Sequence, residues 1–321
     1  MTKRLLIIDN LNLFLRSYIV DPSLSTNGQP IGGLKGALKA LQKICREVRP
    51  DRIAVCWDGQ GGSTKRRLMH KGYKEGRKTL RLNRDVKILT EDQELQNKIW
   101  QQTRLAEYYN EMPIMQFMFK AIEADDVISY ICNLEEYESY QKVIVSSDKD
   151  FYQLLNDSTI LYRPTQKQII NKKQLIDEYN IHPNNFALAR AMAGDRSDNL
   201  KGVEGVGLKT AAKRFPMLLN EQGATVDEVV DYARTSLEEK KLKIYEKVAE
   251  NYDLVLKNYQ IMQLYTPVLS IEAKKTIRET CREPDLGVNK TELMKMMLQD
   301  GFGEINFSEL FQTLKRIAVN R

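Results

Sequence analysis

The fold is decided by the stretch RLLIIDN, Arg4 to Asn10, in which four consecutive apolar residues stand between an arginine and an aspartate. Short apolar runs of this kind are typical of strands that are buried on both faces of a parallel sheet. Two similar runs follow in the chain, RIAVCW from Arg52 to Trp57 and KVIVS from Lys142 to Ser146. We predict a strand for each of the three runs.

The segment between the first two runs has the pattern of a helix. In GGLKGALKALQKICREVRP, residues 32–50, apolar side chains recur every three or four residues and Pro50 stands at the end. A strand, a helix and a strand in this order predict an α/β fold with a central, mainly parallel twisted sheet and helices on both faces.

The remaining chain divides into segments of different character. Residues 58–85 lack an apolar period and are predicted to form an exposed, partly mobile excursion, whereas 89–109 and 123–138 have helical patterns. Residues 184–215 are predicted to form a helix, a glycine turn and a helix, and the Lys/Glu-rich chain beyond 227 is predicted to be helical, most clearly over 238–256. We therefore expect an α/β core over 1–183 with an arch or basic loop at about 60–100, a helix-hairpin-helix over 184–216, and a helical C-terminal region over 217–321.

Composition restricts the possible chemistry. The 321 residues are 42% hydrophobic and 29% charged, as in folded soluble proteins, and no run approaches eighteen apolar residues, so a cytoplasmic location is expected. The four cysteines form no C-x-x-C pair, and only two histidines are present. A zinc site and most histidine-dependent catalysis are therefore not expected, which leaves carboxylates, lysines and arginines.

Positive charge is concentrated in one segment. The net charge is only +6, but the stretch from Lys65 to Arg84 contains nine Lys or Arg residues and a single acid, Glu75. Such a block repels itself unless it meets a polyanion. A solvated charged surface is the plainer alternative, although acids that would interleave such a surface are nearly missing.

Acidic residues stand where the predicted strands end and where helices begin. Carboxyl ends of parallel strands share one edge of a sheet, so these side chains should converge and repel unless divalent cations offset their charge. Taken singly, each acid could equally be a turn residue or a helix cap. Oxygen ligands alone favour Mg²⁺ or Mn²⁺, and two such ions can promote in-line displacement at a phosphodiester. The nine acids are Asp9, Asp58, Glu123, Asp125, Asp126, Asp148, Asp150, Asp195 and Asp198.

A glycine-rich stretch, GVEGVGLKT from Gly202 to Thr210, resembles a phosphate-binding loop but misses the pattern G-x-x-x-x-G-K-[ST] by one residue. No strand is predicted immediately before it. Gly205 and Gly207 instead suit the tight turn of a helix-hairpin-helix, whose backbone amides meet a DNA phosphate without reading bases. A purely structural turn is the alternative.

Six motifs in this order resemble the 5′-nuclease superfamily, which comprises flap endonucleases, the 5′→3′ exonuclease domain of bacterial DNA polymerase I and bacteriophage 5′-exonucleases. They are LLIIDN, WDG, YKEGRK with Arg66 upstream, IEADD, SSDKDF and GDRSDNLKGVEGVGLKTA, and they span residues 5–211. The chain is most similar in character to free-standing bacteriophage enzymes such as the T-even RNase H type. The resemblance implies the PIN-like 5′-nuclease fold with a helical arch.

The resemblance also implies roles for particular residues. Asp9, Asp58, Glu123, Asp125 and Asp126 would lie nearest the catalytic metal, and Asp148, Asp150, Asp195 and Asp198 would form the second metal region, with Asp125 between them. Basic residues of the arch would act on the scissile phosphate, and an aromatic would stack on an unpaired base. These are Arg66, Lys74 and Arg77 as catalytic residues, and Tyr73 with Gly202, Gly205, Gly207, Lys209 and Thr210 as DNA-binding residues.

The function implied is a Mg²⁺-dependent 5′-nuclease that cleaves DNA flaps, nicks and free 5′ ends, and RNA annealed to DNA, during replication. We expect two Mg²⁺ ions, replaceable by Mn²⁺, and K⁺ at the helix-hairpin-helix. We also expect a monomer without membrane contact, whose C-terminal helices either contact a sliding clamp or single-strand-binding protein or serve as plain support. The alternatives are a non-catalytic helix-hairpin-helix DNA-binding protein and a PIN-like ribonuclease.

Overall fold

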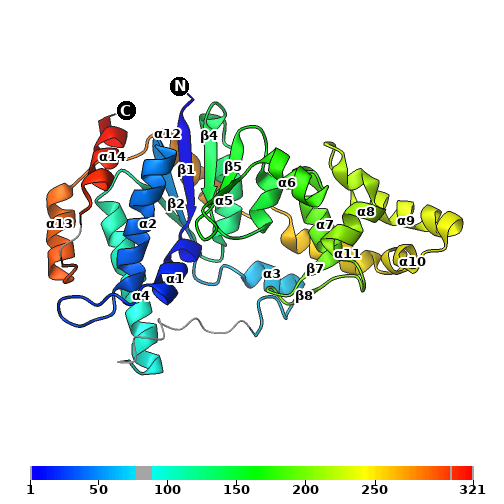
Figure 1. Cartoon of the computed structure of the whole chain (residues 1–321), viewed down its shortest axis with the longest axis horizontal. Helices are drawn as coiled ribbons and strands as arrows, with labels where there is room; N and C mark the ends of the chain where they lie inside the picture. The colour runs from blue at the N-terminus through cyan, green and yellow to red at the C-terminus, as the bar shows by residue number, and fades with distance from the viewer. Residues whose placement is uncertain (1, 77–88, 304–305, 320–321) are drawn as a thin grey trace.

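A six-stranded sheet forms the centre of the structure, a computed structural model that describes residues 2–76, 89–303 and 306–319. Its strand order is β3-β2-β1-β4-β5-β6, and every neighbouring pair is parallel except β5 with β6. β1 therefore lies between β2 and β4 near the middle of the sheet (Figure 1). The strands are β1 (Arg4–Asp9), β2 (Arg52–Trp57), β3 (Met115–Met118), β4 (Gln141–Val145), β5 (Thr159–Arg163) and β6 (Gln168–Ile170).

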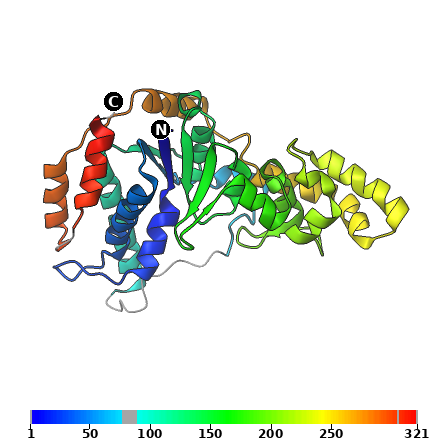
Figure 2. The ribbon, with the colours of Figure 1, turned by 45° about the horizontal axis from the view of Figure 1, so that its top comes forward.

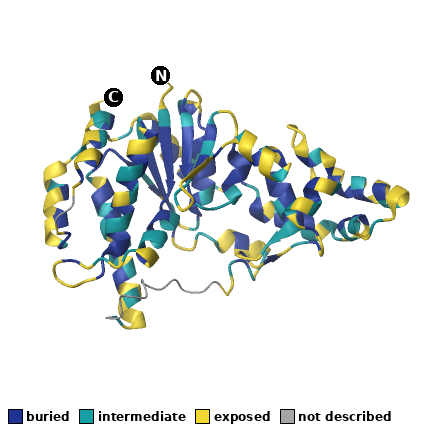
Figure 3. Ribbon diagram, viewed as in Figure 1, coloured by how far each residue is buried: buried dark blue, intermediate teal, exposed yellow. Residues whose placement is uncertain are grey.

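Both faces of the sheet are covered, which explains the continuous apolar runs of its central strands. Leu5 and Ile7 of β1 belong to one apolar core, whereas Leu6 and Ile8 belong to the core on the opposite face. Side chains that alternate across a strand thus all become buried (Figure 3).

One core contains helices from both ends of the chain. Its buried residues come from α1 (Asn10–Val20), α2 (Gly32–Val48), α4 (Glu91–Asn110), α13 (Lys290–Gln299) and α14 (Ser308–Val319). The other core contains residues of α5 (Ala124–Cys132), η1 (Glu135–Tyr137), η2 (Asp150–Leu154) and α12 (Ile271–Arg282), and it continues into the helices that follow η2.

A helical arm extends from the β5–β6 side of the sheet and includes a short hairpin of β7 and β8 (Figures 1 and 2). After the arm, the chain returns to the α/β core through α12. The elements of the arm are α6 (Lys172–Tyr179), η3 (Pro183–Asn185), α7 (Phe186–Ala193), β7 (Gly194–Asp195), β8 (Leu200–Lys201), α8 (Leu208–Arg214), η4 (Pro216–Leu219), α9 (Val226–Lys240), α10 (Lys243–Glu250) and α11 (Tyr252–Met262).

The structure confirms the predicted α/β sheet and its three central strands, and it adds β3, β5 and β6. It also refines the expected excursion after β2. Most residues of its described part, 58–76, are exposed as predicted, but the segment forms α3 (Thr64–Met69) followed by turns, and Arg66 is buried. Arg66 therefore anchors an otherwise exposed segment to the core, because a buried guanidinium requires acidic partners on neighbouring elements.

Two predicted helices are shorter than expected. The helix expected over 123–138 ends at Cys132, where the Asn133 side chain donates to the Ser129 carbonyl and so competes with the backbone. The helix expected over 238–256 is three helices, because Lys241 adopts the left-handed conformation and a break follows at Asn251. Within the described ranges, no helix combines the length and apolarity needed to cross a membrane.

Candidate metal centre

Four predicted metal ligands gather at the carboxyl edge of the sheet. Asp9 is the last residue of β1, Asp58 follows β2, Asp148 follows β4, and Asp125 is in the first turn of α5. Asp58 also accepts a hydrogen bond from the Ala124 amide (2.8 Å), which fixes the start of α5 beside the strand ends. Burial, together with repulsion from neighbouring carboxylates, raises the pKa of Asp125 well above its ordinary value. This group concentrates negative charge at the sheet edge, where Asp9 is buried, Asp125 and Asp148 are half-buried and Asp58 is exposed.

Hydrogen bonds join this group to the next acids along the chain. The Ser146 hydroxyl donates to Asp9 (2.8 Å) and accepts from the Asp148 amide (3.0 Å), and Asp148 accepts from the Asp150 amide (2.9 Å). Burial raises the pKa of Asp9 to about 7, although the bond from Ser146 opposes this shift. The loop after β4 is thus stabilised by its own side chains. It places Asp148 beside Asp9 and Asp150 in the next group of acids.

The second group consists of Asp150, Asp195 and Asp198, whose carboxylate oxygens lie within 4.8 Å of one another. Asp150 begins η2, and Asp195 ends β7. Arg190 of α7 donates to Asp150 (2.8 Å) and to Asp195. Burial raises the pKa of Asp150 to about 7, whereas for Asp195 the attraction of Arg190 and bonds from Ser197 outweigh burial and lower the pKa. The core and the arm therefore meet at these three carboxylates.

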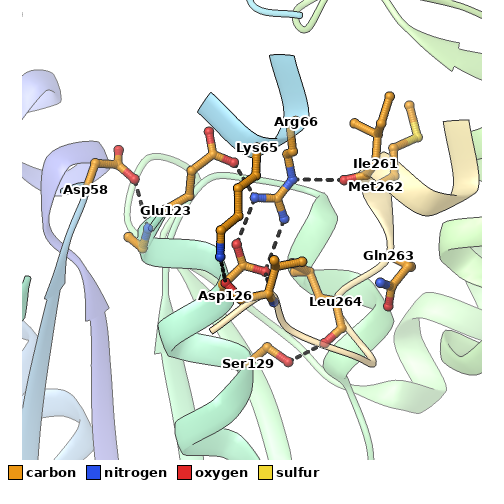
Figure 4. Close-up of polar contacts among 12 residues, drawn as sticks. Asp58, Lys65, Arg66, Glu123, Asp126, Ser129, Ile261, Met262, Gln263 and Leu264 are labelled. Carbon is orange, nitrogen blue, oxygen red and sulfur yellow. Dashed lines mark hydrogen bonds and ion pairs between the residues drawn. The ribbon is translucent and has the colours of Figure 1, made fainter. Parts of the chain in front are cut away.

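Glu123 and Asp126 are placed differently from the other predicted ligands. Arg66 donates to Glu123 and binds Asp126 through two nitrogens (2.8 and 3.2 Å), and its Nε donates to the Ile261 carbonyl (2.9 Å), as Figure 4 shows. All three charged side chains are buried. In this structure both acids thus serve as partners of Arg66, and a role in metal binding for either of them remains a prediction.

The predicted arch residues lie close to these acids. Lys74 forms an ion pair with Glu123, and its backbone amide donates to the Asp198 carbonyl (3.0 Å). Tyr73 is buried and its hydroxyl donates to Glu123 (3.4 Å), so in this structure it is packed internally, and stacking on an unpaired base remains a prediction. Arg77, the third predicted basic residue, lies outside the described residues.

The donor set fits a hard divalent cation. It contains only oxygen ligands, three of them are close enough to share one ion, and Arg190 supplies a positive charge beside them. Raised pKa values at Asp9 and Asp150 are those expected of carboxylates gathered without a cation. Among the described residues, only the group of Asp150, Asp195 and Asp198 brings three carboxylate oxygens close enough to share an ion, and a cation held by the group around Asp9 remains a prediction.

The predicted glycine turn lies between β8 and α8. A side chain at Gly202 would collide with the backbone of Ala193, so the packing of the arm itself requires glycine there. Gly205 has a positive φ of 80°. Gly207 has ordinary backbone angles and open space around it, and Lys209 and Thr210 follow in the first turn of α8. Internal packing therefore does not explain Gly207, which leaves its backbone accessible to a ligand.

Sequence reasoning did not identify Arg190 or Ser146. Arg190 is the one charged residue in the apolar run FALARAMA, and a cation inside such a run signals a buried acidic partner. No comparable signal marks Ser146, whose role depends on the neighbouring strand β1.

Two family models match most of the chain. The model described as 5′-3′ exonuclease, N-terminal resolvase-like domain, matches residues 4–180. The model described as 5′-3′ exonuclease, C-terminal SAM fold, matches residues 181–283. The first covers the sheet, and the second begins in the arm and ends just beyond α12.

The chain is similar to relatives of about its own length and to much longer ones. A 5′-3′ exonuclease of Aquifex aeolicus is 26% identical, over 95% of this chain and 96% of its own length. The thermostable DNA polymerase I of Thermus aquaticus is 29% identical over 88% of this chain, which spans only 30% of the polymerase.

Solved structures from bacteriophage T5 have a similar fold. A flap endonuclease from that phage, in a pseudo-enzyme-product complex with DNA and metal ions, is 20% identical with a TM-score of 0.69 over 88% of this chain and all of the other. A 5′-exonuclease of the same phage with bound zinc is also 20% identical, with a TM-score of 0.68 over 88% of this chain and 99% of the other.

Proposed function

The chain belongs to the 5′-3′ exonuclease family, and from this premise we propose that it is a divalent-metal-dependent 5′ nuclease acting on DNA ends and flaps. The observation that carries the proposal is the meeting of two carboxylate groups at the sheet edge, beside Lys74. A DNA-binding protein without catalysis would gain nothing from these acids, because unpaired carboxylates oppose binding to a polyanion.

In this mechanism the reacting phosphodiester would lie beside the two acid groups, whose repulsion for it the bound cations would offset. Divalent cations, when bound, would supply positive charge and a water of lowered pKa for in-line attack. Asp9, Asp58, Asp125 and Asp148 would hold one cation, and Asp150, Asp195 and Asp198 the other. This proposal moves Asp148 from the second metal region, where the sequence placed it, to the first, because its charge acts on both Asp9 and Asp125. The products would carry a 5′-phosphate and a 3′-hydroxyl.

Basic side chains complete the proposed site. Lys74 would exchange its ion pair with Glu123 for the scissile phosphate once cations neutralise the acids. Arg77 is proposed for the same task from its sequence position alone. Arg66 is proposed to orient Glu123 and Asp126, because its donors are directed at these acids and at a backbone carbonyl.

Duplex DNA would be gripped by the glycine turn before α8. What supports this is the exposed backbone at Gly205 and Gly207 next to the exposed Lys209. Contacts of this kind bind phosphates without reading sequence. The hairpin is joined to Asp198 by only a few residues, so a duplex held there would direct its strand toward the second acid group.

The finer assignments extend this proposal. We propose Mg²⁺ as the physiological ion with Mn²⁺ as a substitute, K⁺ at the hairpin, and RNA annealed to DNA as a further substrate during replication. A monomer, a cytoplasmic location, a bacteriophage source, and a sliding clamp or single-strand-binding protein as partner belong to the same proposal.

Product mapping tests the proposed activity. The full chain is mixed with 5′-labelled flap, nicked and RNA/DNA hybrid duplexes and with unstructured RNA, in Mg²⁺, in Mn²⁺ or in EDTA. We expect metal-dependent cleavage near the flap junction and at 5′ ends, with binding retained in EDTA. Asp148→Asn should lower the rate by about a hundredfold, since loss of a ligand should exceed the 10–100-fold effect of losing a supporting residue.

Asp157→Asn is the matched control, because the Asp157 side chain is exposed. A wild-type rate in Asp148→Asn would contradict the metal role of that residue. Binding without cleavage in either metal would favour a non-catalytic DNA-binding protein, and preferential cleavage of unstructured RNA would favour a ribonuclease.

A further inference from the structure

One connecting segment, Ile261–Val268, runs from α11 to α12 and is hydrogen-bonded to neighbours of both acid groups. It contains no regular secondary structure after Met262, yet its backbone receives hydrogen bonds from side chains of three separate elements. We call this segment the strap. Because α11 belongs to the arm and α12 packs on the core, the strap is also a covalent link between the two.

On one side the strap is held by residues next to the first acid group. Arg66 donates from Nε to the Ile261 carbonyl while its other nitrogens bind Glu123 and Asp126 (Figure 4). Asp126 in turn accepts from the Val268 amide (3.1 Å), and Ser129 donates to the Leu264 carbonyl (2.5 Å). Both ends of the strap are therefore fixed to α3 and α5.

On the other side the strap is held by Gln153, a buried residue of η2. Its Nε2 donates to the Met262 carbonyl (3.1 Å) and to the Asp150 carbonyl (2.8 Å), and its Oε1 accepts from the Leu264 amide (2.6 Å). One amide group thus connects the backbone of Asp150, a member of the second acid group, to two points of the strap.

The same segment is packed against the arm. Ile261 and Met262 form a small buried cluster with Leu200 of β8 and with Tyr73. Asp195 and Asp198 lie at and just after β7, the hairpin partner of β8. The strap therefore contacts the surroundings of every acid that we propose for the second cation.

We propose that the strap sets the separation of the two acid groups and that Gln153 is the positioning residue which fixes Asp150 to it. The inference rests on the proposed function and deepens it. Two-cation chemistry requires carboxylates held within tenths of an ångström, and Gln153 achieves this without touching cation or substrate. The Gln153 side-chain amide connects η2 of the core to the strap, which continues from α11 of the arm.

The chain offers a matched control for a merely structural role. Gln101 is likewise a buried glutamine whose amide donates twice, to the Pro30 carbonyl and to Asn97, and accepts once, from the Leu34 amide. It lies in α4, in the apolar core on the opposite face of the sheet from the strap. Gln101→Leu and Gln153→Leu therefore remove equivalent hydrogen bonds in different places.

Mn²⁺ binding and steady-state cleavage test the proposal on the full chain. Mn²⁺ affinity is followed by electron paramagnetic resonance, and thermal unfolding is measured in parallel. We expect Gln153→Leu to weaken one of two Mn²⁺ affinities by about 10- to 100-fold and to lower kcat on a flapped duplex by a similar factor, with KM for DNA within about twofold. Gln101→Leu should lose similar thermal stability and keep both Mn²⁺ affinities and kcat.

Equal Mn²⁺ affinities and equal kcat in the two variants would overturn the proposal. If Gln153→Leu does not fold, Ser129→Ala removes a single hydrogen bond to the strap. This variant should also weaken one Mn²⁺ affinity and lower kcat, but by smaller factors. A wild-type protein that binds two Mn²⁺ without cleaving DNA would contradict the proposed function, and the Mn²⁺ affinities would still decide the role of Gln153. A wild-type protein that binds no Mn²⁺ would overturn the inference itself.

Discussion

At the scale of single residues, Arg190 supplies the positive charge that pairs with the second acid group. Its guanidinium pairs with Asp150 and with Asp195, and these carboxylates come from the core and from the arm. The positive charge of Arg190 partly replaces what a cation would supply. It therefore allows the acids to remain close together before any cation binds.

Replacement of Arg190 should destabilise the cation-free protein most. We expect Arg190→Gln to lower the free energy of unfolding by about 3 kcal/mol in EDTA, the low end for a buried ion pair, because two half-buried carboxylates lose their partner. Urea denaturation with and without Mg²⁺ measures the effect, and Mg²⁺ should restore part of the loss. Arg234→Gln, which removes an exposed ion pair on α9, should change stability little. Equal losses in both variants would refute the role of Arg190.

The pKa values of two acids predict how stability depends on pH. Burial raises the pKa of both Asp9 and Asp150 to about 7, from an ordinary value of 3.8. The folded state therefore binds more protons than the unfolded state between pH 4 and 7, so stability should decrease as pH rises through this range and level off above it.

Thermal unfolding in EDTA at several pH values measures this dependence. Cation binding requires deprotonated ligands, so the rise in Tm caused by Mg²⁺ should be larger at pH 8 than at pH 5.5. Asp9→Asn should flatten the fall between pH 4 and 7. A Tm in EDTA that increases through this range would contradict the raised pKa values.

At the scale of elements, the glycine turn and α8 form the unit that we propose binds duplex DNA. Gly202 is explained by its close approach to Ala193, whereas Gly207 has no internal explanation. Lys209 is exposed next to it. The turn thus combines a structural glycine with a surface that a phosphate could approach.

Lys209→Ala should weaken duplex binding in a salt-dependent way. Loss of one phosphate contact should lower the slope of log K against log salt concentration by about 1, while Mn²⁺ affinity stays unchanged. Fluorescence anisotropy in EDTA over a series of salt concentrations provides the slope. Lys275→Ala, on the exposed side of α12, serves as the control. An unchanged slope in Lys209→Ala would count against this contact.

At the scale of the whole molecule, the end of the chain stabilises its beginning. Residues of α13 and α14 belong to the same apolar core as α2 and β1, although they lie beyond the part of the chain that the family models match. Leu310 and Leu314 are fully buried there. These helices are therefore part of the α/β core in the structure.

Leu314→Ala should accordingly lower the free energy of unfolding by about 2–5 kcal/mol, as expected for a buried leucine. Leu298→Ala on α13 is the control, since this leucine is 82% exposed, and it should cost less than about 0.5 kcal/mol. Urea denaturation measures both. A small effect at Leu314 would mean that α14 is loosely attached.

The sequence by itself determined the three central strands of the sheet and the region of the site. Local apolar runs define β1, β2 and β4, and parallel strands necessarily bring the acids at their carboxyl ends to one edge. Motif order alone was enough to suggest the family.

Only the tertiary structure decided the partner of each charge. Arg66 could be read as an exposed basic residue, yet it is buried between Glu123, Asp126 and the Ile261 carbonyl, which is 195 residues away in the chain. Gln153 and Ser146 carry no sequence signal, because their partners come from other elements. Periodicity records which face of an element is buried, whereas hydrogen-bond partners depend on distances that exist only after the chain has folded.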